Sequence, residues 1–367
     1  MLANHALEAE VSRLSRDQPR QGGSTAYLQS APRLIESLEG GVVLRRCVLK
    51  SEVSTALYCA RTGVIVCQDC RIIDCRGSGV VVGKGGTVEL HGGEVSSCRG
   101  YGAVALGGCK LKVTLGEKGG ARFANNAATG LSAHEGGLVD VLGATISGNG
   151  ECGVSAQLGS TVALKDCSIS ANGSGVAAQE HSTAELVNTE IARNKTFGVS
   201  VTLTSTTCIS GCKIVRNGGN GLTVLKGAEA VVGTSTLSGN AGAGVLTSED
   251  ANTTITNSEM RSNEQHGMVA QKGACITARA CLLLSNLGAG ALAAFPKSRV
   301  GIIGGQVKGN RIGLVATDQG IVAEAEGCEI SDNTEAPEVA KTDGQVLHPV
   351  ARPPSVVAVG RAGKEHL

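Results

Sequence analysis

The residues of this chain best suited to chemistry form one polar group near the middle of the sequence. Its members are His134, Glu135, Gln157, Gln179, Glu180 and His181. An imidazole and carboxylates on neighbouring repeats could exchange protons as a general acid and a general base. Constellations of this kind are more often solvated surface side chains. We therefore expect a candidate surface patch, called the polar patch here, and we assign no catalytic residue.

Glycosidic chemistry would need two well-placed carboxylates, or a calcium cluster with a basic residue. The sequence has no paired aspartates and no dense aspartate cluster, and Asp140, Asp166 and Asp318 lie far apart. An exposed aromatic platform for sugar rings is also missing, and the chain has no Trp, three Phe and three Tyr. We therefore expect no catalysis and no recognisable lyase, hydrolase or epimerase motif.

Metal binding is a second alternative, because Cys67, Cys70 and Cys75 have the spacing of half a zinc site. A closed site also needs a fourth ligand, which only Cys47, Cys59 or Cys98 could supply. Cys70 and Cys75 fall on repeat positions that account for them as small buried side chains. We therefore expect no metal and no cofactor.

A strict repeat positions all of these residues. A glycine recurs from Gly79 to Gly313 at a nearly constant interval, about 23 residues in all but two of its ten gaps. An asparagine keeps the same interval in the later repeats. The asparagines are Asn126, Asn149, Asn172, Asn194, Asn217, Asn240, Asn263, Asn286, Asn310 and Asn333. A period of this length indicates a solenoid.

Within one repeat, from Gly153 to Asn172, apolar and polar residues alternate in three short bursts. Alternation with period two is typical of a strand with one buried face. Three strands in about 23 residues leave no room for a helix, so each repeat makes one turn of a coil. The predicted fold is all-β, a single-stranded right-handed parallel β-helix (solenoid) of about 12–13 such coils.

Each repeated residue has an expected structural role. We expect the asparagines to form a structural ladder, since each side-chain amide can donate to the next along the stack. The glycine four residues later is expected to adopt a conformation that a Cβ would penalise. The residue three before each asparagine is apolar in every turn, which indicates a core position. Alternate residues after the glycine are expected to face outward on the first strand, where such stacks most often bind ligands.

Three domains follow from where the repeat starts and stops. Residues 1–40 are expected to form an N-terminal cap with a short helix, because the open end of a solenoid must be covered. Residues 41–335 form the β-helix, with a protruding loop at Gly116 to Gly120. Residues 336–367 are rich in proline and poor in large apolar residues, so we expect a disordered tail.

Charge and cysteine usage restrict partners and location. The chain has 33 basic and 32 acidic residues, which gives no reason to expect nucleic acid or a membrane surface as a partner. The segment from Met1 to Gln21 lacks the apolar core of a signal peptide, and no run is long enough to cross a bilayer. The 14 cysteines therefore indicate a reducing setting, cytoplasmic or nuclear, and we expect a monomer.

The string Asn-x-x-x-Gly-Val-x-Val followed by Cys-x-Ile-Ser-x-Asn, as in Asn149 to Asn172, resembles the parallel β-helix repeat family. That family includes carbohydrate-binding proteins, pectate lyases, polysaccharide epimerases, and intracellular β-helix domains of F-box and Shc-SH2-binding proteins. The resemblance covers residues 40 to 335, and the short, aromatic-poor coils look most like the intracellular type. That type implies recognition of protein substrates for ubiquitin ligation, although residues 1–40 are too short for a full F-box.

The predicted function is a non-catalytic protein-interaction scaffold, linked by this resemblance to substrate recognition by a ubiquitin ligase. Its expected partner is a protein. The alternative is a carbohydrate-binding or polysaccharide-modifying β-helix protein of the lyase or epimerase kind. Carbohydrate therefore stays open as a second partner.

Overall fold

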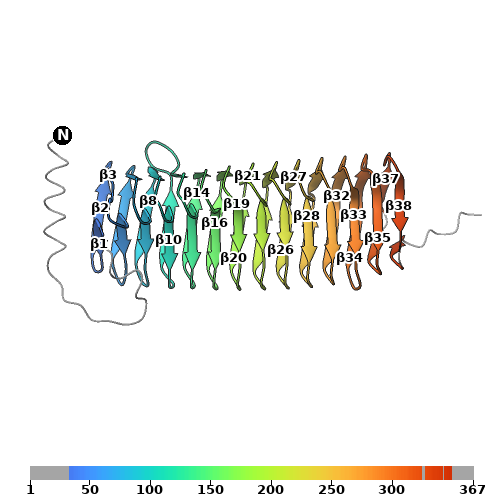
Figure 1. Ribbon diagram of the computed structural model, residues 1–367, viewed down its shortest axis with the longest axis horizontal. Helices are drawn as coiled ribbons and strands as arrows, with labels where there is room; N and C mark the ends of the chain where they lie inside the picture. The colour runs from blue at the N-terminus through green and yellow to red at the C-terminus, as the bar shows by residue number, and fades with distance from the viewer. Residues whose placement is uncertain (1–32, 325–326, 342, 349–367) are drawn as a thin grey trace, which may run out of the picture.

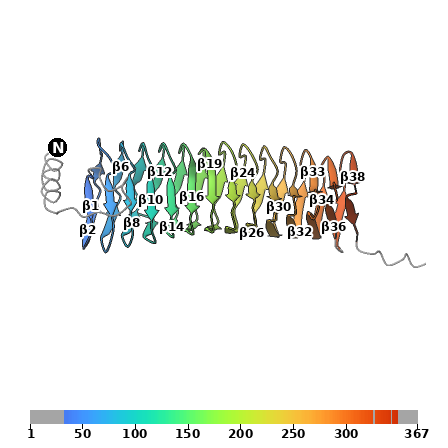
Figure 2. The ribbon, with the colours of Figure 1, turned by 60° about the horizontal axis from the view of Figure 1, so that its bottom comes forward.

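The computed structural model describes residues 33–324, 327–341 and 343–348. Three rows of strands run along its length, and every strand pairs in parallel with the strand one coil away (Figure 1). Sheet A has 14 strands, one in each coil. Rows B and C form one sheet of 25 strands, because β32 and β34 run through both rows. The predicted parallel β-helix is confirmed, and the view in Figure 2 shows the coils stacked in one straight row.

The strands of sheet A are β1 (Ile35–Ser37), β4 (Leu57–Cys59), β7 (Val80–Val82), β10 (Ala103–Leu106), β13 (Leu131–His134), β16 (Cys152–Gln157), β19 (Ser174–Ala178), β22 (Val199–Val201), β25 (Leu222–Val224), β28 (Val245–Ser248), β31 (Met268–Gln271), β33 (Ala289–Ala294), β35 (Ile312–Thr317) and β38 (Ala336–Ala340). Row B contains β2 (Gly41–Arg45), β5 (Val64–Gln68), β8 (Thr87–His91), β11 (Lys110–Thr114), β14 (Leu138–Leu142), β17 (Thr161–Lys165), β20 (Thr183–Val187), β23 (Thr206–Ser210), β26 (Glu229–Gly233), β29 (Asn252–Thr256), β36 (Ile321–Glu324) and β39 (Gln345–Leu347). Row C contains β3 (Val48–Leu49), β6 (Arg71–Ile73), β9 (Glu94–Ser96), β12 (Arg122–Ala124), β15 (Thr145–Ser147), β18 (Ser168–Ser170), β21 (Glu190–Ala192), β24 (Lys213–Val215), β27 (Thr236–Ser238), β30 (Glu259–Arg261) and β37 (Cys328–Ser331). The two strands shared by both rows are β32 (Cys275–Leu284) and β34 (Arg299–Lys308).

The core is a column of small and branched apolar side chains inside the coils. Inward residues of all three rows belong to one continuous cluster, from Ile35 to Val322. Phe123 is fully buried and is the largest of them. Because most of the other core residues are Val, Ile, Leu, Ala and Cys, each coil stays narrow and regular.

The ten asparagines form a continuous hydrogen-bonded ladder at the bend before sheet A. From Asn126 to Asn310, each Nδ2 donates to Oδ1 of the asparagine in the next coil, over 2.9 to 3.2 Å. Each Nδ2 also donates to a backbone carbonyl of the preceding coil, as Asn217 does to Ile191 O over 3.2 Å. The ladder therefore satisfies both side-chain and backbone groups inside the stack.

The recurring glycines have a different cause from the one predicted. None of the eleven has a φ in the left-handed region. A Cβ on Gly175 would instead lie 2.1 Å from Gly198 O and 2.6 Å from Ile191 Cγ2, and a Cβ on Gly153 would lie 2.8 Å from Asn172 Nδ2. Close approach of the next coil, not backbone conformation, excludes a side chain there.

The stack continues past the predicted boundary at residue 335. Strand β38 pairs with β35, and β39 pairs with β36. Prolines suggested a disordered tail, but a strand on the last coil needs only the free backbone groups of the coil before it. Val346 also packs against the core. The stack also begins before the predicted boundary at residue 41, since β1 pairs with β4 as the first strand of sheet A. The helix predicted for the N-terminal cap falls outside the described residues.

The inserted loop projects beside β8 and β10 in Figure 1. Gly116 and Gly119 close it through two backbone hydrogen bonds of 2.8 and 3.2 Å. Arg46, from an earlier coil, forms an ion pair with Glu117 in the loop. Among the residues that the structure describes, no helix has the length and apolar character to span a membrane.

Candidate functional site

The outer face of sheet A is recessed along much of the stack. Its middle position is at most 8% exposed in most coils, for example at Val81, Ser132 and Ser155. These residues are not part of the core, since the core cluster contains their neighbours Val80 and Val82 but not Val81. The sequence predicted an outward, ligand-facing row here. The structure shows instead that this row is recessed, and it is called the groove floor here.

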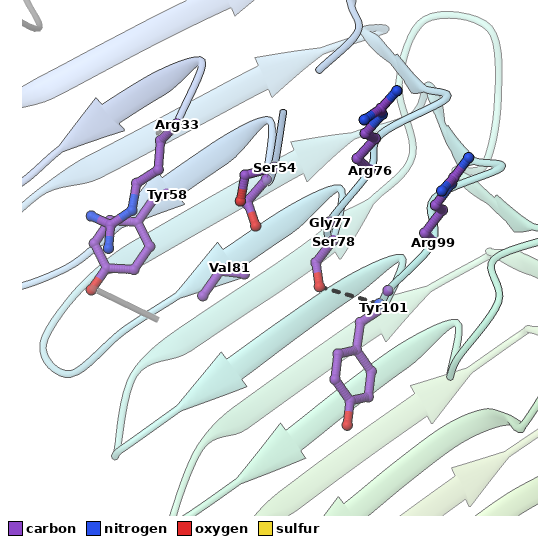
Figure 3. A pocket seen from close by; sticks show the side chains of 11 residues that line it. Arg33, Ser54, Tyr58, Arg76, Gly77, Ser78, Val81, Arg99 and Tyr101 are labelled. Atoms are coloured by element: carbon purple, nitrogen blue, oxygen red, sulfur yellow. Dashed lines mark hydrogen bonds between the residues drawn. The ribbon is translucent and has the colours of Figure 1, made fainter. Parts of the chain in front are cut away.

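A pocket of about 250 Å³ opens on this face at the N-terminal end of the stack (Figure 3). Four consecutive coils contribute its walls. Its lining residues are Arg33, Ser54, Thr55, Tyr58, Arg76, Gly77, Ser78, Val81, Arg99, Gly100 and Tyr101.

Two tyrosines supply the aromatic surface of the pocket. Tyr58 lies at the centre of β4 and points outward, and the guanidinium of Arg33 stacks on its ring at 3.3 Å from the centroid. Tyr101 lies in the turn before β10, where its backbone N–H donates to Ser78 Oγ over 3.2 Å. Both rings are partly exposed, and Arg33 covers one face of Tyr58.

Arg76 and Arg99 supply positive charge. They occupy the same turn of consecutive coils, and Arg99 N donates to Cys75 O over 2.8 Å. Both side chains are exposed and stand side by side in Figure 3. Neither forms an ion pair with any carboxylate of the described residues, whereas nearby Asp74 pairs with Lys50 over 2.9 Å. The two adjacent guanidinium groups give this side of the pocket a positive charge.

A second hollow of about 400 Å³ lies on the other side of the two arginines. It is lined by Glu52, Asp74, Cys75, Arg76, Ser97 and Arg99. The arginines therefore form a ridge between two hollows.

The polar patch lies at the opposite edge of sheet A. His134 ends β13 in register with Gln157 at the end of β16, and Gln179 follows β19 in the next coil. Glu135 and Glu180 lie in the turns that follow, with φ of 52° and 56°.

His181 lies in the same turn as Glu180, with a φ of 62°. Its Nδ1 is 2.6 Å from Thr204 Oγ1. The structure thus brings the predicted residues together along one edge. Of these six, His134 is the one that reaches back over the groove, to Ser132.

The rings of His134 and Tyr101 join the polar patch to the pocket. Their centroids are 6.0 Å apart at an interplanar angle of 73°, an edge contact. His134 Nε2 is 2.8 Å from Ser132 Oγ, which is 2.6 Å from Ser155 Oγ. When Ser132 accepts from Nε2–H and donates to Ser155, the Nδ1 lone pair of His134 is free to accept a proton.

The pKa values of this pair are shifted in opposite directions. Burial lowers the pKa of His134, although Glu135 and Glu180 oppose the shift. Burial raises the pKa of Tyr101, and the charge of Glu151 adds to the effect. Near neutral pH the imidazole is therefore a neutral base, and the phenol keeps its proton.

Most of the cysteines are buried, whereas Cys208 is exposed. Among the described residues, no group of three His, Cys, Asp or Glu side chains is placed to hold a metal. Cys67, Cys70 and Cys75 are buried, and Cys70 faces inward. A thiol hydrogen bond from Cys67 lowers the pKa of Cys70 to about 6 and raises the pKa of Cys67.

Four residues of the pocket were not predicted from the sequence: Tyr58, Tyr101, Arg76 and Arg99. The small number of aromatic residues suggested that no sugar platform exists, but two of them share one pocket. The available signal was the interval between Arg76 and Arg99, which equals one repeat and places two arginines at the same position of adjacent coils. A further signal was the bulk of Tyr101, at a position where the neighbouring coils have the smaller Ser78 and Thr129.

Solved structures of similar shape are polysaccharide enzymes by name. A double mutant of the periplasmic alginate epimerase AlgG aligns with a TM-score of 0.52 and 10% identity, over 79% of this chain and 78% of that one. The A-module of the Azotobacter vinelandii mannuronan C-5 epimerase AlgE4 aligns with a TM-score of 0.40 and 12% identity, over 86% and 90%. The pectate lyase Pel9A aligns with a TM-score of 0.40 and 13% identity, over 75% and 69%. At sequence identities this low, the similarity between these structures and this chain is a similarity of fold alone.

The prediction of a non-catalytic protein-interaction scaffold is overturned by the AlgG structure, whose TM-score is 0.52. That protein is an alginate epimerase by name, which belongs to the alternative that the sequence left open. The finer resemblance to the intracellular F-box and Shc-SH2-binding type finds no support among the similar structures named above. That prediction was wrong because it took the lack of known catalytic motifs as evidence of a protein-binding role.

The sequence itself gives the family. No curated protein has a sequence that matches this chain. The family model described as "Right handed beta helix region" matches residues 118–233 and 204–347, which is more than half of the chain. Together with the parallel coils, this match shows that the chain belongs to the right-handed β-helix family.

Proposed function

We propose that this protein binds an acidic polysaccharide on the outer face of sheet A and removes a proton next to a sugar carboxylate, as a lyase or an epimerase does. One observation carries the proposal: two tyrosines and two arginines without acidic partners among the described residues share a pocket, and His134 touches Tyr101. The pocket is called the tyrosine–arginine pocket below.

The lining of the pocket suits a sugar acid. Aromatic rings pack against the apolar face of a sugar ring, and the hydroxyls of Ser54 and Ser78 can bond to sugar hydroxyls. Arg76 and Arg99 can bind carboxylates through charge-assisted hydrogen bonds. Alginate, which appears in the name of the AlgG structure, is a polymer of uronic acids and carries a carboxylate on each sugar.

The pair at the edge of the pocket suits proton transfer. A proton on the carbon beside a carboxylate becomes more acidic when a cation neutralises that carboxylate, which Arg99 can do. His134 can accept this proton at Nδ1, and Tyr101 can donate its phenolic proton. When a proton returns to the opposite face of this carbon, the configuration of the carbon is inverted. Loss of the neighbouring glycosidic oxygen, protonated by the phenol, instead cleaves the chain with formation of a double bond.

Replacing Arg76 and Arg99 together with alanine is expected to weaken binding of polygalacturonate about 100-fold, because two charge-assisted contacts of about 1.4 kcal/mol each are lost. Titration calorimetry on the wild type and the variant measures the effect. The affinity of the wild type should also fall as salt is added, and that of the variant should fall less.

Arg216→Ala is the matched control, because Arg216 is exposed and lies several coils away from the pocket. It should bind polygalacturonate as the wild type does. An unchanged dissociation constant in the double variant would contradict the proposal. Binding of neutral dextran as tight as that of polygalacturonate would contradict it too.

A further inference from the structure

The turn that carries Arg99 and Tyr101 has a counterpart four coils further along. Arg99 directly follows the ladder position at Cys98, and Tyr101 directly precedes a recurring glycine. Lys195 follows the ladder asparagine Asn194 in the same way, and Phe197 precedes the recurring glycine of its coil. The same turn therefore presents a cation and an aromatic ring twice.

The register of sheet A fixes the separation of the two pairs. Strands β10, β13, β16, β19 and β22 are in register without a break, with Ala103, Leu131, Val154, Val176 and Val199 as successive partners. Four steps of about 4.8 Å place the pairs roughly 19 Å apart along the axis. That separation exceeds the length of a disaccharide.

The second pair is accessible. Lys195 is exposed and forms no ion pair with the carboxylates that the structure describes. Phe197 is partly exposed, although it is a large apolar residue. Beside them, Thr196 Oγ1 is 2.7 Å from Ser174 Oγ, which adds a pair of hydroxyls to the aromatic ring and the charge. The tyrosine–arginine pocket also contains cations, aromatic rings and hydroxyl groups.

Small side chains line the surface between the two pairs. In the column that holds Tyr101 and Phe197, the intervening residues are Thr129, Cys152 and Ser174. The groove floor over the same coils is Ser132, Ser155 and Ala177, each at most 2% exposed. No bulky side chain of these two columns therefore separates the pairs.

The two neighbouring edges of this stretch carry polar side chains. His134, Gln157 and Gln179 follow one another along the far edge. Glu151 lies on the near edge and accepts a hydrogen bond from Thr129 Oγ1 over 3.3 Å. A bound polymer would turn sugar hydroxyls, not carboxylates, toward Glu151.

We propose that Lys195 and Phe197 form a second subsite for the same acidic polysaccharide, so that the polymer lies along the axis of the solenoid and spans both pairs. This inference rests on the proposed function. The chemistry favours a polyanion with sugar rings over a plain polyanion, since each cation comes with an aromatic ring. It also predicts that affinity depends on chain length.

The test compares a galacturonate disaccharide with polygalacturonate. Replacing Lys195 and Phe197 together with alanine is expected to weaken binding of the polymer about tenfold and to leave disaccharide binding unchanged. The change of Arg76 and Arg99 to alanine should weaken both. Phe197→Leu serves as a second variant, because it keeps an apolar side chain for packing and removes the aromatic face.

Lys213→Ala is the control for the loss of one exposed lysine, since Lys213 lies in row C, away from sheet A. Polymer binding that is unchanged in the Lys195 and Phe197 variant would overturn the second subsite alone. Equal losses for the disaccharide and the polymer would also overturn it. A wild-type protein that binds neither ligand would overturn the proposed function, and the subsite with it.

Discussion

Replacement of Asn217 with alanine is expected to lower the free energy of unfolding by about 3 kcal/mol or more. Its Nδ2 donates to Asn240 Oδ1 and to Ile191 O, over 3.1 and 3.2 Å. Its Oδ1 accepts from Asn194 N and Asn194 Nδ2, over 3.1 and 3.0 Å. Alanine would leave all four of these partner groups buried without their hydrogen bonds to this side chain. Denaturant unfolding followed by circular dichroism measures the loss.

A stack of coils can open locally, so a second measurement is needed. Hydrogen exchange at the backbone amide of Asn194 should be faster in the variant, since this amide donates to the side chain that is removed. Asn252→Ala is the control, because Asn252 is exposed in row B and its side chain makes no hydrogen bond with the described residues. It should change stability by less than about 0.5 kcal/mol. A similarly small effect for Asn217→Ala would show that the ladder does not stabilise the stack.

Replacement of His134 with glutamine is expected to lower the turnover of an acidic polysaccharide about 100-fold to 10,000-fold, because glutamine cannot accept the proton. Polygalacturonate or alginate in D₂O provides the assay. Exchange of the hydrogen beside the carboxylate, followed by NMR, reports proton removal for both a lyase and an epimerase. His91→Gln is the control, since His91 lies in row B and bonds to Thr114.

The pH dependence separates a base from a structural histidine. The pKa of His134 is lowered from its usual 6.5, so the neutral base form is lost only as the pH falls through that lower pKa. Activity of the wild type should therefore stay level at neutral pH and decline on the acid side. His134→Gln should lose this decline together with the rate. If the activity of the variant still declined at low pH, another group would have to cause the decline. That result would contradict the role of His134 as the base.

The repeat made most of the fold predictable. The positions of Ile169 and Asn172 recur in coil after coil. The residues found at one such position along the chain therefore indicate whether it is a core position or a ladder position. The glycine column shows the limit of this reasoning. A recurring Gly175 indicates that a side chain is excluded, but only the spacing of coils shows that Gly198 O and Ile191 exclude it.

The site was less predictable because it consists of departures from the columns. Tyr101 is an exception at its position, and its significance depends on its distance to His134 of the next coil. The side chain of His134 folds back toward Ser132, which alternation of strand residues does not predict. The residues of the polar patch lie along one edge of sheet A, and the pocket opposite them was not predicted. The monomeric state and a cytoplasmic or nuclear location stay predictions.

The asparagine ladder has a consequence for how the length of this molecule can change. Each rung bonds to an identical rung on either side, so a whole coil can be gained or lost without any new bonding partner. Such an event would leave the tyrosine–arginine pocket intact when it falls on the C-terminal side of Gln157. If it fell between that point and Lys195, it would move the second cation and aromatic ring by one coil, about 4.8 Å. Duplication of coils would therefore change the distance between the two proposed subsites in steps of one coil.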